Sequence, residues 1–115
     1  MTWSNARTPK QGEIWLAHLH FAENPNVGKV RPVLILDSRT KNKRIQVVCL
    51  KVTSKHRDDG REDVAIKNWQ GCGLRKPSYV RLDQVFEISQ SELLRELPIG
   101  ILDKEELTGI LSYFE

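Results

Sequence analysis

The chain has 115 residues, of which 39% are hydrophobic and 29% are charged, and its formal net charge is +3. This composition excludes a disordered or fibrous protein, and the longest apolar run, Val33–Leu36, is too short to cross a membrane. We therefore expect one domain over residues 1–115, loosely ordered over residues 1–10, in the cytoplasm and with no membrane partner.

The first half of the chain predicts three strands joined by turns. Gly12–Phe21 predicts a strand, and the turn-rich segment Ala22–Gly28 predicts a loop. Val30–Asp37 predicts a second strand, whose continuous apolar residues indicate burial on both faces. A polar turn at Ser38–Lys43 then precedes a third strand at Arg44–Val52.

The second half continues with short strands and longer loops. A charged loop at Thr53–Arg61 leads into Glu62–Lys67, which alternates apolar and polar residues as a strand does. Trp69–Pro77 is rich in glycine and predicts a loop, and Tyr79–Ile88 predicts another strand. Leu93–Leu102 allows one more short strand.

The C-terminal segment predicts a helix. Asp103 and Glu106 have the spacing of a capping box at a helix start. The apolar residues that follow at helical spacing are Leu107, Ile110, Leu111 and Phe114. Many short strands with one terminal helix predict a mainly-β fold, built as a strongly bent sheet or a small barrel.

Cysteines and histidines provide no pattern for a metal site. Cys49 and Cys72 lie far apart and predict two free thiols in a cytoplasmic chain. His18 and His20 share one face of the first strand, but no neighbouring residue offers a third ligand. Because no CxxC or HxxxH spacing occurs, the sequence predicts no metal site and no cofactor.

One strand carries a pattern suited to a phosphate. In Tyr79–Val85, strict alternation places Tyr79, Arg81 and Asp83 on one face. Residues two apart lie roughly 6.6 Å from each other, which leaves room for a phosphate between a cation and a carboxylate. Tyr79 could stack on a base. The alternative is an Arg and an Asp on a solvated face, each paired with its neighbours.

Other segments carry candidates of the same kind. Arg31, before the apolar part of the second strand, could clamp a phosphate or lie at the sheet edge with its stem buried. The hydroxyls of Thr53 and Ser54, where a strand ends, could hold phosphate oxygens or cap a turn. His56, in the basic loop, could reach a substrate.

Five short segments, taken in order, resemble the MazF/PemK/Kid toxins of type II toxin–antitoxin systems. They are Gly12–Leu16, Gly28–Ile35, Val52–Ser54, Gly73–Ser78 and Val80–Gln84, and Ile99–Leu102 before the helix also fits. The resemblance implies an SH3-like barrel of the CcdB/PemK/MazF type with a C-terminal helix. It also implies a homodimer, a cognate antitoxin and metal-independent, sequence-selective cleavage of single-stranded RNA.

By motif position, the resemblance assigns catalytic roles to Arg31, Thr53, Arg81 and Asp83. Asp83 would act as general base on the 2′-hydroxyl, the two arginines would stabilise the phosphorane, and Thr53 would position an oxygen. The expected products carry a 2′,3′-cyclic phosphate and a 5′-hydroxyl. The residues expected to bind RNA are Ser54, Lys55, His56, Lys76, Tyr79 and Gln84.

Three points stay open in this interpretation. Some relatives carry a functional histidine in the loop before the Arg-Pro motif, whereas Ala22–Gly28 has none, so His56 or a water would have to supply the proton. A gyrase poison of the CcdB type would need a Trp-Gly-Ile-like end, and this chain ends Ser112–Glu115. A non-catalytic nucleic-acid-binding module would need the basic stretch Arg39–Arg57 but not Asp83.

Overall fold

A computed structural model of the chain describes residues 8–21, 24–57 and 62–115. The expectation of loose order over residues 1–10 therefore falls mostly outside the described residues. Within them, one antiparallel sheet has the strand order β4-β5-β3-β2-β1-β6. None of the helices in this part of the chain is long and apolar enough to span a membrane.

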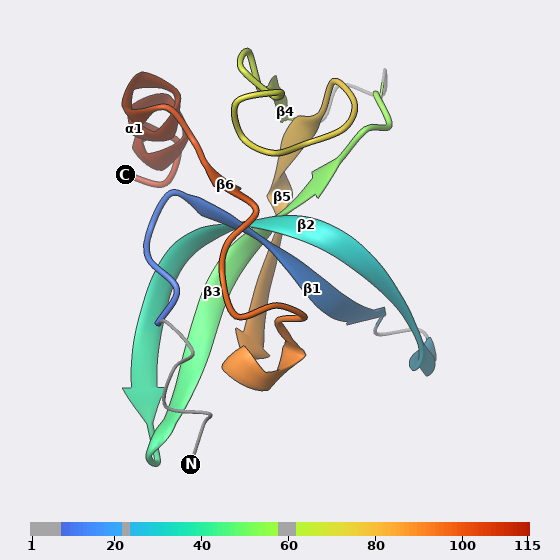
Figure 1. Cartoon of the computed structure of the whole chain (residues 1–115), viewed down its shortest axis with the longest axis vertical. Coiled ribbons are helices and arrows are strands. Elements are labelled where there is room, and N and C mark those ends of the chain that lie inside the picture. Colours follow the sequence, from blue (N-terminus) through green and yellow to red (C-terminus); the bar gives the residue numbers. More distant parts are fainter. Residues whose placement is uncertain (1–7, 22–23, 58–61) are drawn as a thin grey trace.

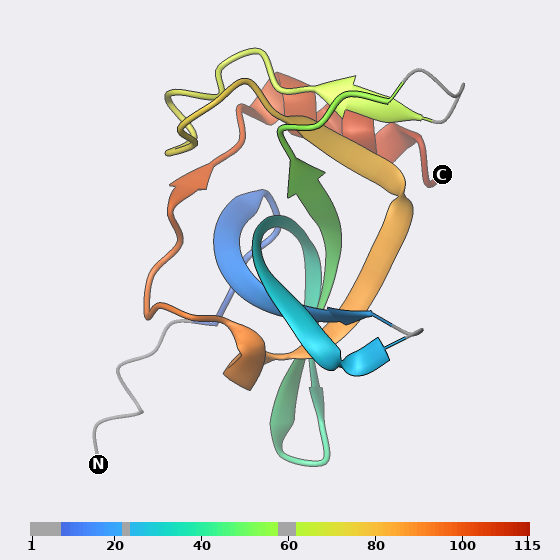
Figure 2. The ribbon, with the colours of Figure 1, turned by 90° about the vertical axis from the view of Figure 1, so that its right-hand side faces the viewer.

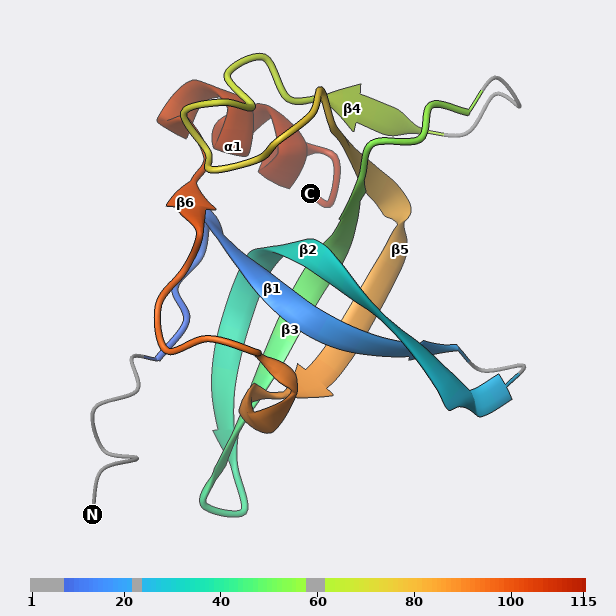
Figure 3. The ribbon, with the colours of Figure 1, turned by 45° about the vertical axis from the view of Figure 1, so that its right-hand side comes forward.

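The sheet curls into an open half-barrel, and one helix lies at the end where β4 is found (Figures 1 and 3). Its strands are β1 (Glu13–Phe21), β2 (Asn24–Lys41), β3 (Arg44–Thr53), β4 (Asp63–Ala65), β5 (Tyr79–Ser89) and β6 (Gly100–Ile101). The helical elements are the 3-10 turn η2 (Gln90–Glu92) and the helix α1 (Lys104–Ser112). The expected mainly-β barrel with a C-terminal helix is confirmed.

The long strand β2 corrects two predicted turns. The loop expected over Ala22–Gly28 is strand from Asn24 onward, and residues 22–23 lie outside the described part. Gly28 pairs with His20 on β1, so cross-strand pairing overrides the local turn propensity. In the same way, the turn expected over Ser38–Lys43 shrinks to the two residues between β2 and β3.

Those two residues form a tight hairpin turn. Asn42 and Lys43 both have positive φ, at 54° and 66°, as a type I′ turn requires. Because a lysine is strained there and glycine is not, Lys43→Gly is expected to raise the free energy of unfolding by about 0.5–1 kcal/mol. Urea unfolding measures this gain. Lys41→Gly, within the strand, should instead destabilise the protein.

The apolar run of β2 is buried on both faces, as predicted. Leu34 belongs to a cluster with Ile14 and Ile110 of α1. Val33 and Ile35 belong to a second cluster with Trp15, on the other side of the strand. Figure 2 shows how the sheet bends around these strands, which allows one strand to contribute to two cores.

The C-terminal helix differs from its prediction at both ends. Asp103 is the N-cap residue, but its side chain makes no capping hydrogen bond. Glu106 Oε1 instead accepts a hydrogen bond of 2.6 Å from the Lys67 backbone N–H, which ties the helix to the loop after β4. Ile110 is buried, whereas Phe114 lies beyond the helix end and is 44% exposed.

The strand allowed over Leu93–Leu102 is reduced to β6. The segment before β6 runs along β1 through separate hydrogen bonds, from Leu94 N to Leu16 O (3.0 Å) and from Ile99 N to Ile14 O (2.8 Å). This irregular segment thus lies beside β1, where it forms one wall of the cavity described next.

Candidate active site

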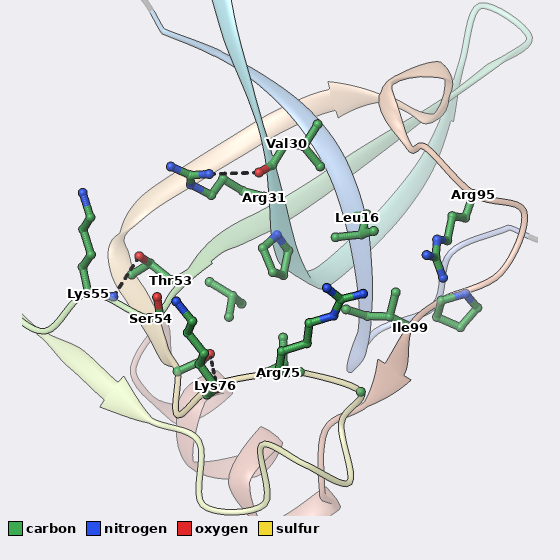
Figure 4. A pocket seen from close by; sticks show the side chains of 16 residues that line it. Leu16, Val30, Arg31, Thr53, Ser54, Lys55, Arg75, Lys76, Arg95 and Ile99 are labelled. Carbon is green, nitrogen blue, oxygen red and sulfur yellow. Dashed lines mark hydrogen bonds between the residues drawn. The ribbon is translucent and has the colours of Figure 1, made fainter.

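A cavity of about 780 Å³ opens beside the middle of β2 and the end of β3 (Figure 4). Its walls come from β1 and β2, from the end of β3, from the loop before β5 and from the segment before β6. The residues that line it are Leu16, Val30, Arg31, Pro32, Val52, Thr53, Ser54, Lys55, Gly73, Leu74, Arg75, Lys76, Ser78, Arg95, Pro98 and Ile99. A cavity of this size can hold a ligand as large as a nucleotide.

The lining of the cavity is strongly positive. Among the residues that the structure describes, it contains five cationic side chains and no carboxylate, and the cations are Arg31, Lys55, Arg75, Lys76 and Arg95. A concave surface of one sign focuses the electric field and attracts ions of the opposite sign. The two hydroxyls at the end of β3 add neutral hydrogen-bonding groups, so the cavity is suited to a phosphate group.

The end of β3 places Thr53 and Ser54 at the cavity. Thr53 pairs with Tyr79 at the last position of the β3–β5 ladder, and its side chain is buried. Its Oγ1 accepts a hydrogen bond of 3.2 Å from the Lys55 backbone N–H, so the chain turns immediately after the strand. On β2, the Arg31 guanidinium donates to the Val30 carbonyl at 3.0 Å and stays at the rim.

Backbone contacts hold two walls of the cavity together. Gly73 has φ of +79°, and a Cβ atom there would lie 2.1 Å from the Ile99 carbonyl oxygen. A Cβ atom on Gly100 would lie 2.0 Å from the Cys72 carbonyl oxygen. Glycine is therefore required at both positions, because any side chain would force the two backbones apart.

Arg81 lies behind the cavity instead of lining it. Its side chain is 8% exposed, its Nη2 donates to the Lys55 carbonyl at 3.0 Å, and its Nη1 is 3.9 Å from Asp63. Among the described residues, its buried Nε has no hydrogen-bond partner. Arg81 thus supports the backbone of a residue that lines the cavity.

The alternation predicted for β5 holds around Arg81, although both faces of the strand are buried there. Leu50 pairs with Val85 and Val52 pairs with Val80, so four residues of β5 bulge opposite one residue of β3. Val80 and Leu82 pack in the core on one face. Arg81 and Asp83 lie on the other face, where they contact Asp63 and Arg57.

Asp83 also lies outside the cavity lining and contacts Arg57. Two hydrogen bonds join them, from Nη2 to Oδ1 at 2.8 Å and from Nη1 to Oδ2 at 3.3 Å. Arg57 also binds the buried carboxylate of Asp63, and these hydrogen bonds, to Asp63 first and then to Asp83, raise the pKa of Arg57. Neither Arg57 nor Asp63 was expected from the sequence, because Arg57 is one charge within a charged loop and Asp63 is one polar residue of an alternating strand.

The remaining predicted residues lie at different places. Ser54, Lys55 and Lys76 line the cavity with Arg31 and Thr53, as residues of one site would. His56 and Tyr79 do not line it, but their ring centroids are 5.2 Å apart, and they form a small aromatic surface next to the end of β3. Gln84 is half-buried on β5, beside the bulge, and is also absent from the lining.

Residues 10–114 match the profile of the PemK-like, MazF-like toxins of type II toxin–antitoxin systems. The chain belongs to this family. Among solved structures, the Mycobacterium tuberculosis toxin MazF-mt6 is similar over 88% of this chain and 89% of its own, with 27% identity and a TM-score of 0.62. No curated protein matches the chain in sequence.

A second similar structure is an endoribonuclease in complex with its cognate antitoxin, from a mycobacterial species. It covers 90% of this chain and 87% of its own, with 17% identity and a TM-score of 0.61. At this identity the likeness concerns the fold alone. Both structures therefore agree with the half-barrel of this MazF-like toxin.

In this MazF-like toxin, sequence reasoning missed three cations near the site. Arg75 and Arg95 line the cavity (Figure 4), although they come from segments with no regular secondary structure. Arg75 lies in the Gly73–Ser78 segment, so the resemblance offered a signal for it, whereas nothing marked Arg95. Lys51 lies two residues before Thr53, on the same strand.

The environment of Lys51 shows how strongly positive this part of the toxin is. Burial, followed by the charges of neighbouring cations, lowers the pKa of Lys51. Those neighbours are Arg81, Arg31, Lys29 and Lys55. The crowding of like charges predicts that the site lowers the stability of the fold while it attracts an anion.

Removing this charge should therefore stabilise the toxin. We expect Lys51→Met to raise Tm by a few degrees at pH 7 and to weaken the binding of anionic ligands. In the folded state the pKa of Lys51 lies below the usual 10.5, so Lys51 loses its proton at a lower pH in the native state than in the unfolded chain. The stability of the wild type therefore rises with pH until Lys51 also loses its proton in the unfolded chain. The gain in stability of Lys51→Met over the wild type should thus be smaller near pH 10 than at pH 7. Urea unfolding of both proteins at the two pH values measures this difference.

Proposed function

We propose that this toxin is an endoribonuclease that cuts single-stranded RNA at selected sequences without a catalytic metal. The observation that supports the proposal most is the cavity, whose lining, as far as the described residues form it, combines five cations, three hydroxyls and no carboxylate. Such a surface binds a phosphodiester chain through charge and hydrogen bonds. The aromatic pair His56–Tyr79, beside the cavity, offers a place for a base to stack.

The proposed reaction uses the 2′-hydroxyl of the substrate as its nucleophile. Attack on the neighbouring phosphorus breaks the bond to the 5′-oxygen and leaves a 2′,3′-cyclic phosphate and a 5′-hydroxyl. DNA lacks the nucleophile and is not cut. Arg31 would stabilise charge on the phosphorane, Thr53 would position one phosphate oxygen, and Arg81 would hold the Lys55 backbone beside the scissile group.

The proposed reaction also needs a general base for the 2′-hydroxyl and a general acid for the leaving oxygen. Asp83 is the candidate base, and its hydrogen bonds to Arg57 would have to rearrange when RNA binds, because a cation weakens a carboxylate as a base. His56, which is exposed near the end of β3, or a water would protonate the leaving oxygen. His56 belongs to the loop that follows β3, and Asp83 of β5 contacts Arg57 of the same loop, which supports a shared role for the two groups.

The proposed partners are a second copy of the chain and a cognate antitoxin. One similar structure is described as an endoribonuclease in complex with its cognate antitoxin, which supports the second partner. An acidic segment of an antitoxin would complement the positive cavity and would exclude RNA from it. Sedimentation of the purified toxin, alone and with its antitoxin, tests both assemblies.

A cleavage assay tests the proposed activity. The untagged toxin is incubated with single-stranded RNA in EDTA, and we expect fragments that end in a 2′,3′-cyclic phosphate, identified by mass spectrometry. DNA of the same sequence is the matched control and should stay intact. Intact RNA under these conditions, or cutting that depends on added metal, would contradict the proposal.

A non-catalytic nucleic-acid-binding module is the second candidate, because Asp83 is ion-paired outside the cavity. Asp83→Asn separates the two functions. If the toxin is an enzyme that uses Asp83, the variant should cleave RNA at least about 100-fold more slowly and should still bind it. If the toxin is a non-catalytic binding module, the substitution should leave its RNA binding unchanged. A gyrase poison would leave RNA intact and cause DNA breaks in cells that express the chain.

A further inference from the structure

Three potential metal ligands meet at the far end of β1. His18 and His20 lie two residues apart on β1, and Glu92 comes from η2, 72 residues after His20. Glu92 Oε2 is 3.7 Å from His18 Nδ1 and 3.3 Å from His20 Nε2. The three ligand atoms all lie within 4.8 Å of one another. The third ligand that the sequence could not supply is therefore contributed by the fold.

The spacing fits a small divalent ion. Ligand atoms about 2.0–2.1 Å from a tetrahedral zinc lie roughly 3.4 Å from each other, and the two measured separations lie on either side of that value. Two imidazoles and one carboxylate form a donor set that zinc and its neighbours in the transition series prefer over magnesium or calcium. Because the side chains are 39%, 46% and 33% exposed, an ion could enter from solvent.

The three side chains are held close to a binding geometry by their surroundings. The His18 ring lies over Gly28, where a Cβ atom would be 2.5 Å from Nε2, so only glycine leaves this space. The rings of His18 and His20 pack edge to face with centroids 4.5 Å apart. Glu92 lies next to Leu93, which is bridged to Ala17 of β1. Little rearrangement is thus needed to bind an ion.

We propose that His18, His20 and Glu92 form a binding site for one divalent transition-metal ion of the zinc class. The ion joins β1 to η2, and η2 leads into the segment that carries Arg95, Pro98 and Ile99 in the cavity wall. Its role is to fasten this segment to β1. The site is separate from the proposed catalytic residues, none of which belongs to it.

Titration of the untagged, EDTA-treated and dialysed toxin with ZnCl2 tests the proposal. We expect one zinc ion per chain by calorimetry and a rise in Tm of several degrees with excess zinc. Cobalt(II) bound at the same site should give the visible absorption of a tetrahedral or five-coordinate complex. His20→Asn and Glu92→Gln should each weaken zinc binding by at least about tenfold.

Matched variants separate this site from unspecific binding. His56→Ala removes the histidine outside the cluster, and Glu96→Gln removes an exposed carboxylate four residues after Glu92, so both should bind zinc as the wild type does. In wild-type protein, zinc should shift the imidazole NMR signals of His18 and His20 but not of His56. Absent binding, or binding that survives Glu92→Gln, would overturn the proposal, and neither result depends on RNA cleavage.

Discussion

Replacing Arg31 with alanine is expected to reduce RNA cleavage by about 100-fold or more, with little change in Tm. Arg31 lies at the rim of the cavity, and its guanidinium donates a hydrogen bond to the carbonyl of its own neighbour Val30, so the fold does not depend on it. Removal of one group that stabilises transition-state charge typically costs two to three orders of magnitude in rate. Single-turnover cleavage of a labelled RNA measures the loss.

The control for this experiment is Arg44→Ala. Arg44 is exposed beside the β2–β3 turn and does not line the cavity, so the variant loses the same charge at a different place. It should cleave RNA at a rate close to that of the wild type. Equal losses in both variants would show that Arg31 acts only through net charge, and full activity of Arg31→Ala would remove it from the site.

Replacing Asp63 with asparagine is expected to lower the free energy of unfolding by about 3–5 kcal/mol. The Asp63 side chain is 4% exposed and faces two guanidinium groups, those of Arg57 at hydrogen-bond distance and Arg81 at 3.9 Å. Without the carboxylate, Arg81 loses the counter-charge that faces it, and Arg57 keeps only its bonds to the more exposed Asp83. Chemical unfolding of the purified variant, followed by circular dichroism, measures the loss.

An exposed pair of the same type provides the control. Asp37 binds Arg39 at 3.0 Å, but their side chains are 53% and 66% exposed. Asp37→Asn should leave stability nearly unchanged, since solvent screens such pairs. If both aspartate variants are equally stable, the buried network around Asp63 does not hold β4 to β5 as inferred.

The sequence predicted the fold well because its signals were local and repeated. Alternation located β1, β3 and β5 to within one or two residues, and the continuous apolar run of β2 indicated two buried faces. The same signals failed where pairing between distant segments decided the outcome. The turn residues of Ala22–Gly28 became strand, and the capping box at Asp103 was replaced by a contact between Glu106 and Lys67.

For the candidate site, too, the sequence predicted some features and missed others. Arg31 and Thr53, which lie on adjacent strands and which the resemblance assigned to one site, do line one cavity. Alternation predicted that Arg81 and Asp83 share one face of β5, but it could not reveal their partners Asp63 and Arg57, which come from other segments of the chain.

By itself, the sequence determined the family and the mainly-β fold, because these follow from short motifs, residue type and short-range spacing. Only the tertiary structure decided which charges are neighbours. It joined Arg57 to Asp63 and Asp83, and Glu92 to two histidines of β1. The physical reason is that strand register and bulges, which depend on pairing across the whole sheet, set where each side chain lies.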